Sequence, residues 1–257
     1  MFLSIDAGNS NIVFGFYQEV SQSWIHECRI ETTPDLSLLH IEKQLHLFFL
    51  ENEIKPDQIQ RIGFSSVVPD VNLIVEQFCR HYLGKPVFRV NAKRYKNLRV
   101  STKNPNEIGS DLMCNVTAAY EKFGKSVIIV DFGTALTFTA VSDNGEILGV
   151  NIVPGLHTAV KALSMNTAKL PLVKLEFPKS ALGTNTTESI QAGILYGYTG
   201  LVKGMLQAIE GELGFPSKII ATGGLSSILH TLKDRFDLVD RNLTLEGIRL
   251  ITLANGK

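Results

Sequence analysis

A short run of small and polar residues near the N-terminus has the composition of a phosphate-binding loop. It reads Asp6-Ala7-Gly8-Asn9-Ser10-Asn11 and follows an apolar segment. Phosphate sites use backbone N–H groups, small residues that allow close approach, and side chains that donate hydrogen bonds. Asp6 alone would repel a phosphate, so an acid here makes sense if it holds a metal ion that the phosphate also binds. An ordinary hairpin with an Asx turn is the alternative interpretation.

A second run of the same form lies half a chain later. Asp131-Phe132-Gly133-Thr134 also follows an apolar segment, and an offset of 131 − 6 = 125 places Asp131 on Asp6. Both copies read apolar strand, Asp-x-Gly, apolar strand, which predicts two related domains. We expect the two turns to face each other across a cleft. Asp131 would then offer a second cation ligand, and Thr134 a hydroxyl and an amide.

Asp111 is the candidate general base. It stands at the start of a predicted helix that runs through Phe123, where the helix dipole favours an ionised acid. Asn115 lies one turn later on the same face and can orient the carboxylate. The alternative is that Asp111 or Ser110 only caps the helix.

The chain lacks the common nucleotide-binding fingerprints. It contains neither a P-loop nor a GxGxxG segment, so any use of ATP follows another scheme. Gly223-Gly224, between a predicted strand and a predicted helix, would allow a nucleotide to approach the backbone closely.

A long helix is predicted from Thr186 to Leu213. Thr184, Asn185, Thr186 and Thr187 at its start read either as an N-cap cluster or as donors to an anion or hydroxyl. Gly193, Gly197, Gly200 and Gly204 fall on one face of the helix, at spacings of 4, 3 and 4. Because glycine weakens a helix, this stripe predicts close packing, either inside the domain or at a dimer interface.

The elements that would position these residues alternate between strands and helices, which is typical of an α/β fold. A helix is expected to begin at Thr33-Pro34-Asp35, and another at Pro69-Asp70. Strands are expected over residues 2–5, 12–17, 23–30, 61–68, 87–90, 126–131, 136–141, 147–152 and 219–222. We expect two domains, 1–120 and 121–257.

Composition argues against several classes of protein: nucleic-acid-binding, zinc-stabilised, secreted and membrane-spanning. The 257 residues carry 25 Lys plus Arg and 25 Asp plus Glu, so the zero net charge does not predict a nucleic-acid surface. The three cysteines are widely spaced, which argues against a structural zinc site and favours a reducing cytoplasm. No signal segment or membrane span is predicted.

Taken together, these segments resemble type III pantothenate kinases, of the superfamily that includes acetate and sugar kinases, Hsp70 and actin. The resemblance covers nearly the whole chain. It rests on both Asp-x-Gly runs and on the order and spacing of six further segments: Asn104-Pro105 with Gly109-Ser110-Asp111, Pro154-Gly155-Leu156, Thr167-Ala168-Lys169-Leu170-Pro171, Gly183-Thr184-Asn185-Thr186, Gln191-Ala192-Gly193 and Thr222-Gly223-Gly224.

The resemblance implies two ribonuclease H-like (actin-like ATPase) domains with a central cleft, in a homodimer. It implies phosphorylation of pantothenate at its primary hydroxyl by ATP with Mg²⁺ and a monovalent cation, K⁺ or NH₄⁺, as the first step towards coenzyme A. Carried over by position, Asp111 would be the base, Asp131 the monovalent-cation ligand and Thr134 an ATP contact. The nucleotide-phosphate loop would be Asp6, Ala7, Gly8, Asn9, Ser10, Asn11, Ile12 and Val13, and the pantothenate contacts would be Gly109, Ser110, Asp111, Leu112 and Thr186.

Two positions depart from the family pattern. Leu112 stands where the family commonly has Arg, and Thr102 where it often has Tyr. Arg binds a carboxylate bidentately and Leu cannot, so Arg99 or Lys103 would have to substitute. Two alternatives therefore stay open: a kinase of the same fold for another small hydroxy acid or sugar, and a non-catalytic nucleotide-binding regulator. Asp6, Asp111, Asp131 and Thr134 argue against the regulator.

Overall fold

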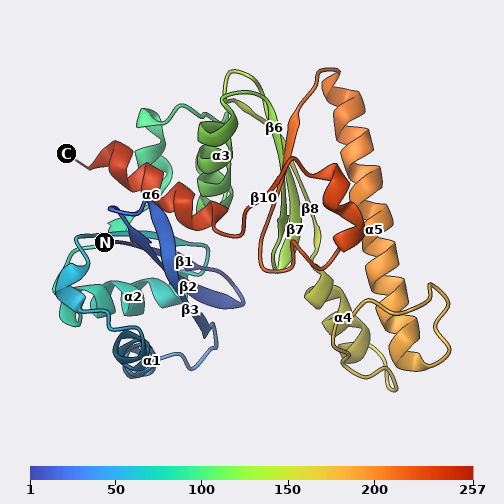
Figure 1. Ribbon diagram of the computed structural model, residues 1–257, viewed down its shortest axis with the longest axis horizontal. Helices are drawn as coiled ribbons and strands as arrows, with labels where there is room; N and C mark the ends of the chain where they lie inside the picture. The colour runs from blue at the N-terminus through green and yellow to red at the C-terminus, as the bar shows by residue number, and fades with distance from the viewer. Residues whose placement is uncertain (257) are drawn as a thin grey trace. The chain divides into compact units, whose positions relative to one another are not determined.

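The structure is a computed structural model that describes residues 1–256. They form two compact units, residues 1–121 with 242–256 and residues 122–241 (Figure 1). The second predicted domain included residues 242–257, whereas the structure places 242–256 with the first unit. The reason is physical: Leu243, Ile248 and Ile251 are buried, and their helix packs on two strands of the first sheet.

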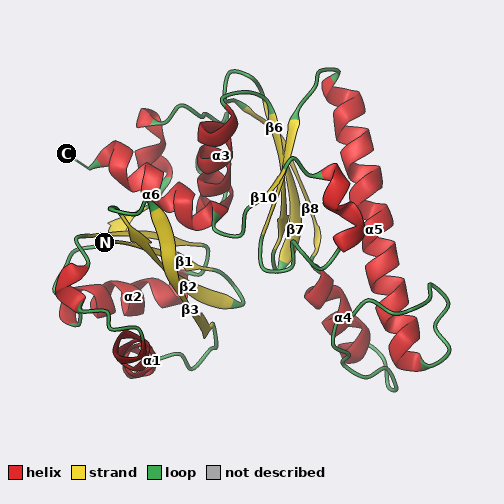
Figure 2. Cartoon of the chain, viewed as in Figure 1, coloured by secondary structure: helices red, strands yellow, loops and turns green. Residues whose placement is uncertain are grey.

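The first unit is a five-stranded sheet with helices on both faces (Figure 2). The strand order is β3 (Ser23–Glu31), β2 (Asn11–Gln18), β1 (Phe2–Ala7), β4 (Arg61–Ser66) and β5 (Phe88–Arg89). The first three strands are antiparallel, and β4 and β5 run parallel to β1. The helices are α1 (Leu38–Glu51), α2 (Pro69–His81), α3 (Ser110–Phe123) and α6 (Leu243–Asn255), with 3-10 turns η1 (Pro56–Gln58) and η2 (Ala92–Asn97).

Alternate residues of these strands point to different layers. Ile5 and Phe64 join the apolar cluster under α1 and α2, to which Phe49 and Phe78 contribute. Ser4 lies on the opposite face and donates to the Leu245 carbonyl of α6 at 2.8 Å. The prediction for α1 was wrong at its start, because Ser37 rather than Thr33 caps the helix, accepting from His40 N.

The second unit repeats the topology of the first. The order is β8 (Ile147–Pro154), β7 (Ala135–Val141), β6 (Val127–Phe132), β9 (Lys218–Thr222) and β10 (Leu238–Val239). As in the first unit, three consecutive strands, β8, β7 and β6, are antiparallel. The next two strands, β9 and β10, run parallel to β6. The remaining elements are α4 (Leu156–Met165), α5 (Thr186–Leu213) and η3 (His230–Arg235). The expected internal repeat is therefore present in the fold.

Two details of the second unit differ from expectation. After Gly224 the chain forms turns and the 3-10 helix η3 rather than an α-helix. In the glycine stripe of α5, a Cβ placed at Gly193, Gly197, Gly200 or Gly204 would meet no atom within 4 Å in the part of the chain that is described, beyond the helix's own nearby backbone. The close packing expected inside the domain is absent there.

Candidate functional site

The first Asp-x-Gly turn is held by its own backbone and by the strand beside it. The Gly8 N–H donates to the Asn11 carbonyl at 2.9 Å, and the Thr32 hydroxyl donates to the Gly8 carbonyl at 2.8 Å. Gly8 has no left-handed φ, but an added Cβ would meet only the Asn11 carbonyl, at 3.5 Å. The backbone is therefore open to a ligand at Gly8.

The predicted phosphate-loop residues divide into exposed and buried ones. Asn9 and Ser10 are exposed, whereas Ala7 and Ile12 are fully buried in the apolar core. Ala7 and Ile12 can contact a ligand only through their backbone. Asp6 lies opposite Val13 on β2 and opposite Ser65 on β4, on the face away from the α1–α2 cluster.

Asp111 stands in the first turn of α3. Its Oδ1 accepts the N–H of Leu112 at 2.8 Å. Burial raises the pKa of the Asp111 carboxyl above 3.8, and this outweighs the hydrogen bonds that lower it. A raised pKa makes a carboxylate a stronger proton acceptor, which suits a general base.

The other predicted residues of this turn are committed to local contacts. The Ser110 hydroxyl lies 2.9 Å from that of Ser65 and donates to the Ser66 carbonyl at 3.2 Å. Any contact of Ser110 with a substrate would therefore use its backbone. Asn115 accepts from the Thr244 hydroxyl of α6 at 2.8 Å, which joins α3 to α6.

The second Asp-x-Gly turn is packed against glycines. A Cβ at Gly223 would lie 2.5 Å from Asp131 Oδ1 and 2.7 Å from the Phe132 backbone, and Gly223 has a φ of +89°. The Gly155 N–H and the Thr158 hydroxyl both donate to the Thr134 carbonyl, at 2.9 and 2.6 Å. These contacts fix the backbone of Thr134 and pack Gly223 closely against the Asp131 side chain.

Two buried hydroxyls flank Asp131 in the sheet. Thr137 on β7 and Thr222 on β9 are its register partners, so the three side chains share one face. Thr222 is fully buried and Thr137 is 8% exposed, and within residues 1–256 neither hydroxyl oxygen has a hydrogen-bond partner. Buried polar groups without partners are uncommon in folded proteins.

This set of oxygen atoms fits a hard cation. A carboxylate and two unsatisfied hydroxyls match the ligand preference of ions such as K⁺ and Mg²⁺. No group of three His, Cys, Asp or Glu side chains is arranged for a metal ion within the described chain. Mg²⁺ commonly uses one or two carboxylates together with substrate phosphates, so the donors present also fit a metal–nucleotide complex.

Thr186 is the first residue of α5 and lines a pocket. The Asn185 side chain caps the helix by accepting from Glu188 N at 3.0 Å, as the N-cap interpretation expected. The pocket has a volume of about 440 Å³, and its remaining lining is Leu163, Leu170, Ser189, Ile190, Gly193 and Ile194. This apolar pocket with two hydroxyls can accept a small, mainly apolar group.

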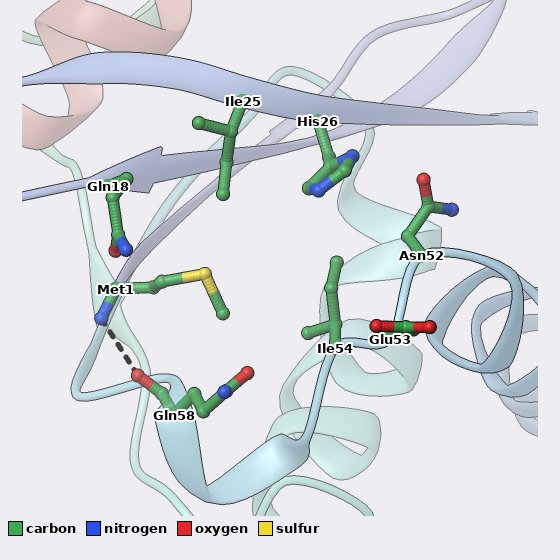
Figure 3. A pocket seen from close by; sticks show the side chains of 8 residues that line it. All are labelled: Met1, Gln18, Ile25, His26, Asn52, Glu53, Ile54 and Gln58. Carbon is green, nitrogen blue, oxygen red and sulfur yellow. Dashed lines mark hydrogen bonds between the residues drawn. The ribbon is translucent and has the colours of Figure 1, made fainter. Parts of the chain in front are cut away.

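A second pocket, in the first unit, contains none of the predicted residues. Its volume is about 420 Å³. Figure 3 shows the side chains that line it: Met1, Gln18, Ile25, His26, Asn52, Glu53, Ile54 and Gln58. None of the residues that line this pocket belongs to either Asp-x-Gly turn.

Arg99, one of the two residues expected to substitute for an Arg at position 112, makes other contacts. Arg99 pairs with Glu121 at 3.2 Å and lies over the Tyr120 ring at 5.4 Å. Thr102 accepts from the backbone N–H of Asn104 at 3.3 Å.

The sequence assigned no role at the site to Ser65, Thr137 or Thr222. Each lies on a strand beside an Asp of an Asp-x-Gly turn. A hydroxyl residue at the end of a neighbouring apolar strand was a usable signal, but the strand pairing that gives it meaning is visible only in the sheet.

The sequence model of the family described as type III pantothenate kinase matches residues 2–208. This chain belongs to the type III pantothenate kinase family. It is 38% identical to the type III pantothenate kinase of Desulforapulum autotrophicum over 98% of this chain and 96% of that one. It is 37% identical to that of Myxococcus xanthus, over 98% and 97% of the two chains.

Solved structures agree on the fold. A Campylobacter jejuni protein assigned to the Baf family of transcriptional activators matches with a TM-score of 0.57 at 20% identity, over 98% of both chains. A Sinorhizobium meliloti protein described as a 2-dehydro-3-deoxygalactonokinase matches with a TM-score of 0.56 at 10% identity, over 100% of this chain and 97% of that one. This member of the type III pantothenate kinase family thus has the actin-like ATPase fold. Within residues 1–256, no helix has the length and apolar character to cross a bilayer.

Proposed function

We propose that this chain transfers the γ-phosphoryl group of ATP to the primary hydroxyl of pantothenate, giving 4′-phosphopantothenate in coenzyme A biosynthesis. The observation that carries the proposal is the near full-length similarity to type III pantothenate kinases. The geometry supports it, because the half-buried acid Asp111 opens a helix and both Asp-x-Gly turns have backbone hydrogen bonds that hold them. A cytoplasmic location, where ATP and Mg²⁺ are supplied, is part of the proposal.

In this mechanism Asp111 accepts the proton of the attacking hydroxyl. Phosphoryl transfer depends mainly on positioning and charge neutralisation, so the base has only to reach the hydroxyl at about 3 Å. The Leu112 N–H orients the carboxylate by donating a hydrogen bond to it. Desolvation raises the pKa of the carboxyl, so it accepts a proton more readily.

The nucleotide is held by backbone rather than by a P-loop lysine. The open face of Gly8 and the polar residues Asn9, Ser10 and Asn11 would receive the phosphates. Asp6 would hold Mg²⁺, directly or through water. Asp131 would hold the monovalent cation, with Thr134 as a further ATP contact. Bound metal ions neutralise the charge that develops on the transferred phosphoryl group.

We also propose that the active protein is a homodimer. The glycine face of α5 supports this, because it has nothing packed on it among the described residues and would let another helix approach closely. Sedimentation of the full chain tests it, and a monomer at the concentrations used in assays would contradict it.

A second candidate substrate follows from Leu112. Without an Arg at this position, and with Arg99 paired to Glu121, recognition of the pantothenate carboxylate needs another donor. A kinase of the same fold for another small hydroxy acid is therefore the alternative.

The experiment is an ADP-release assay with ATP and Mg²⁺, run with pantothenate, with pantoate and with a panel of sugars, in K⁺ and in Na⁺ buffer. The proposal expects turnover that requires pantothenate and K⁺. Turnover with pantoate or a sugar in place of pantothenate would favour the alternative. Nucleotide binding without turnover on any substrate would favour a regulator.

A further inference from the structure

Ser65 lies at the junction of two parts of the proposed active site. It is fully buried near the end of β4 and is the register partner of Asp6 on β1. Its side chain is on the sheet face away from the α1–α2 cluster. This is the face on which the neighbouring Ser4 reaches α6.

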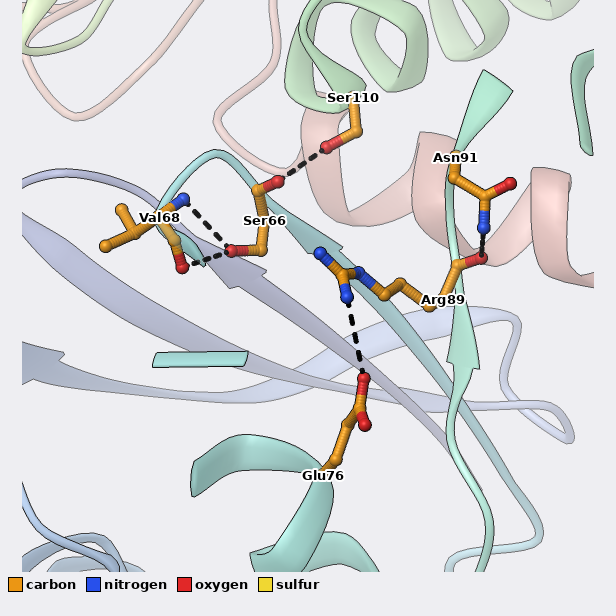
Figure 4. A network of polar contacts seen from close by, with 6 residues as sticks. All are labelled: Ser66, Val68, Glu76, Arg89, Asn91 and Ser110. Atoms are coloured by element: carbon orange, nitrogen blue, oxygen red, sulfur yellow. Dashed lines mark hydrogen bonds and ion pairs between the residues drawn. The ribbon is translucent and has the colours of Figure 1, made fainter. Parts of the chain in front are cut away.

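The Ser65 hydroxyl contacts α3 at two points. It lies 2.9 Å from the Ser110 hydroxyl and forms a hydrogen bond with the Cys114 thiol, one helical turn further on. Ser110 also donates to the Ser66 carbonyl at 3.2 Å, and Figure 4 shows this bond from the helix start to β4. Since a hydroxyl has one proton, Ser65 must be the donor to Ser110 when both bonds of Ser110 form.

The second contact of Ser65 on α3, the Cys114 thiol, is a neutral group. Burial and the nearby carboxylates Asp6 and Asp111 raise the pKa of its thiol well above 9.0, so the thiol stays protonated. Because Ser110 donates to the Ser66 carbonyl, Ser65 donates to Ser110. Two attachments one turn apart fix the rotation of α3 about its axis as well as its distance from β4.

We propose that Ser65 is a positioning residue for phosphoryl transfer, which sets the direction of the Asp111 carboxylate relative to the strand pair that carries Asp6. The inference rests on the proposed function. Ser65 is fully buried, so it acts through α3 rather than on a substrate. A small displacement of a catalytic group costs a large factor in rate, because the reacting atoms must lie within a narrow range of distance and angle.

The test is Ser65→Ala, with Ser4→Ala as a matched control. Ser4 is also fully buried and also bonds to a helix, but to α6 through the Leu245 carbonyl. Both variants lose one buried hydroxyl. We expect kcat to fall about tenfold in Ser65→Ala, with the KM for ATP unchanged, and to stay within twofold of wild type in Ser4→Ala. Equal effects of the two variants would overturn the inference.

A double-mutant cycle with Ser110→Ala separates positioning from general destabilisation. If Ser65 acts through Ser110, the kcat of Ser65→Ala/Ser110→Ala will be close to that of either single variant. Multiplicative effects on kcat would contradict a shared path. Ser65→Cys, which keeps a donor, should recover part of the lost kcat.

A readout independent of turnover keeps this test separate from the proposed function. NMR titration of the Asp111 carboxyl should show its pKa falling towards 3.8 in Ser65→Ala, as water gains access, but not in Ser4→Ala. Two titratable groups that interact with Asp111, Cys114 and Tyr95, have raised pKa values and titrate far above it. Wild type without turnover would count against the proposed function, whereas an unchanged Asp111 pKa in Ser65→Ala would overturn this inference.

Discussion

The two Asp-x-Gly turns stand at the same place in two sheets of the same topology, yet the hydroxyls beside them differ. Next to Asp6, the Ser65 hydroxyl is bonded to α3. Next to Asp131, the hydroxyls of Thr137 and Thr222 are buried and, within residues 1–256, have no partner. The first arrangement uses its hydroxyl to hold a helix, whereas in the proposed function the second would serve a bound cation.

A one-residue difference in the turns contributes to this contrast. Asp6 pairs with Val13, seven residues on, whereas Asp131 pairs with Thr137, six residues on. Because side chains alternate along a strand, the shorter second turn brings a Thr rather than its neighbour Phe138 beside the acid. Duplicated sheets can thus acquire different chemistry through the length of one turn.

The largest effect expected from this comparison concerns the base that the first unit positions. Asp111→Asn keeps the shape of the side chain but removes the proton acceptor, so pantothenate-dependent turnover should fall about 10³-fold. ATP affinity, measured by calorimetry, should stay within about threefold. Turnover near that of wild type would exclude Asp111 as the base.

For the second unit, we expect the main effect to be on the K⁺ dependence of turnover. Asp131→Asn removes the charge from the oxygen cluster, and we expect turnover in K⁺ buffer to fall about 100-fold, to the level that wild type shows in Na⁺. Steady-state rates across a K⁺ titration measure this. A K⁺ dependence that survives in Asp131→Asn would show that the ion binds elsewhere.

Gly223 packs so closely against the second Asp-x-Gly turn that a side chain would not fit there. A Cβ there would overlap Asp131 and the Phe132 backbone, and the φ of +89° disfavours any L side chain. Gly223→Ala should lower the free energy of unfolding by about 2 kcal/mol. Gly149→Ala on β8 is the control, because its Cβ would meet nothing within 4 Å in the described structure and it lies outside the glycine face of α5. Equal denaturation midpoints for the two variants would contradict this account.

The raised pKa of Asp111 predicts a pH-dependent cost to stability. Below pH 3.8 the carboxyl is protonated in both folded and unfolded chains, so it costs nothing there. As the pH rises through the higher folded pKa, the partly desolvated carboxyl must ionise and the protein loses stability. Asp111→Asn should therefore be more stable than wild type at pH 7, with the gain vanishing near pH 3.5. Urea denaturation at both pH values measures it, and an Asn variant less stable at pH 7 would reverse the sign.

The smallest expected effect is on the free energy of unfolding when a buried hydroxyl is removed. It compares Thr222, whose hydroxyl has no partner among residues 1–256, with Ser65, whose hydroxyl is hydrogen-bonded. Thr222→Val removes a buried oxygen that has no partner among residues 1–256, so in Na⁺ buffer its stability should stay within about 0.5 kcal/mol of wild type. Ser65→Ala breaks formed bonds and should lose about 1 kcal/mol. A loss above about 1.5 kcal/mol in Thr222→Val would mean that this hydroxyl has a structural partner.

The sequence allowed the repeat and most elements to be predicted, because each strand is an apolar run that ends at a polar turn. Thr186–Leu213 was predicted with its true bounds, since an Asn cap and a following glycine mark its ends. The helix start at Ser37 and the 3-10 turns after Gly224 were missed, because Thr33-Pro34-Asp35 and Gly-Gly signals also occur in ordinary turns.

The candidate site could be predicted only in part. Asp6, Asp111 and Asp131 stood out by type and by position beside turns and helix starts. Ser65, Thr137 and Thr222 did not, because their importance depends on which strands pair and in which register. The placement of α6 in the first unit was likewise invisible, since it depends on buried contacts between the two ends of the chain.

The most direct test of the central claim is identification of the product by ³¹P NMR after incubating wild type with ATP, Mg²⁺, K⁺ and pantothenate. The account predicts one 4′-phosphopantothenate for each ADP formed. ADP accompanied by inorganic phosphate alone, or no consumption of ATP by folded protein that binds it, would contradict the account.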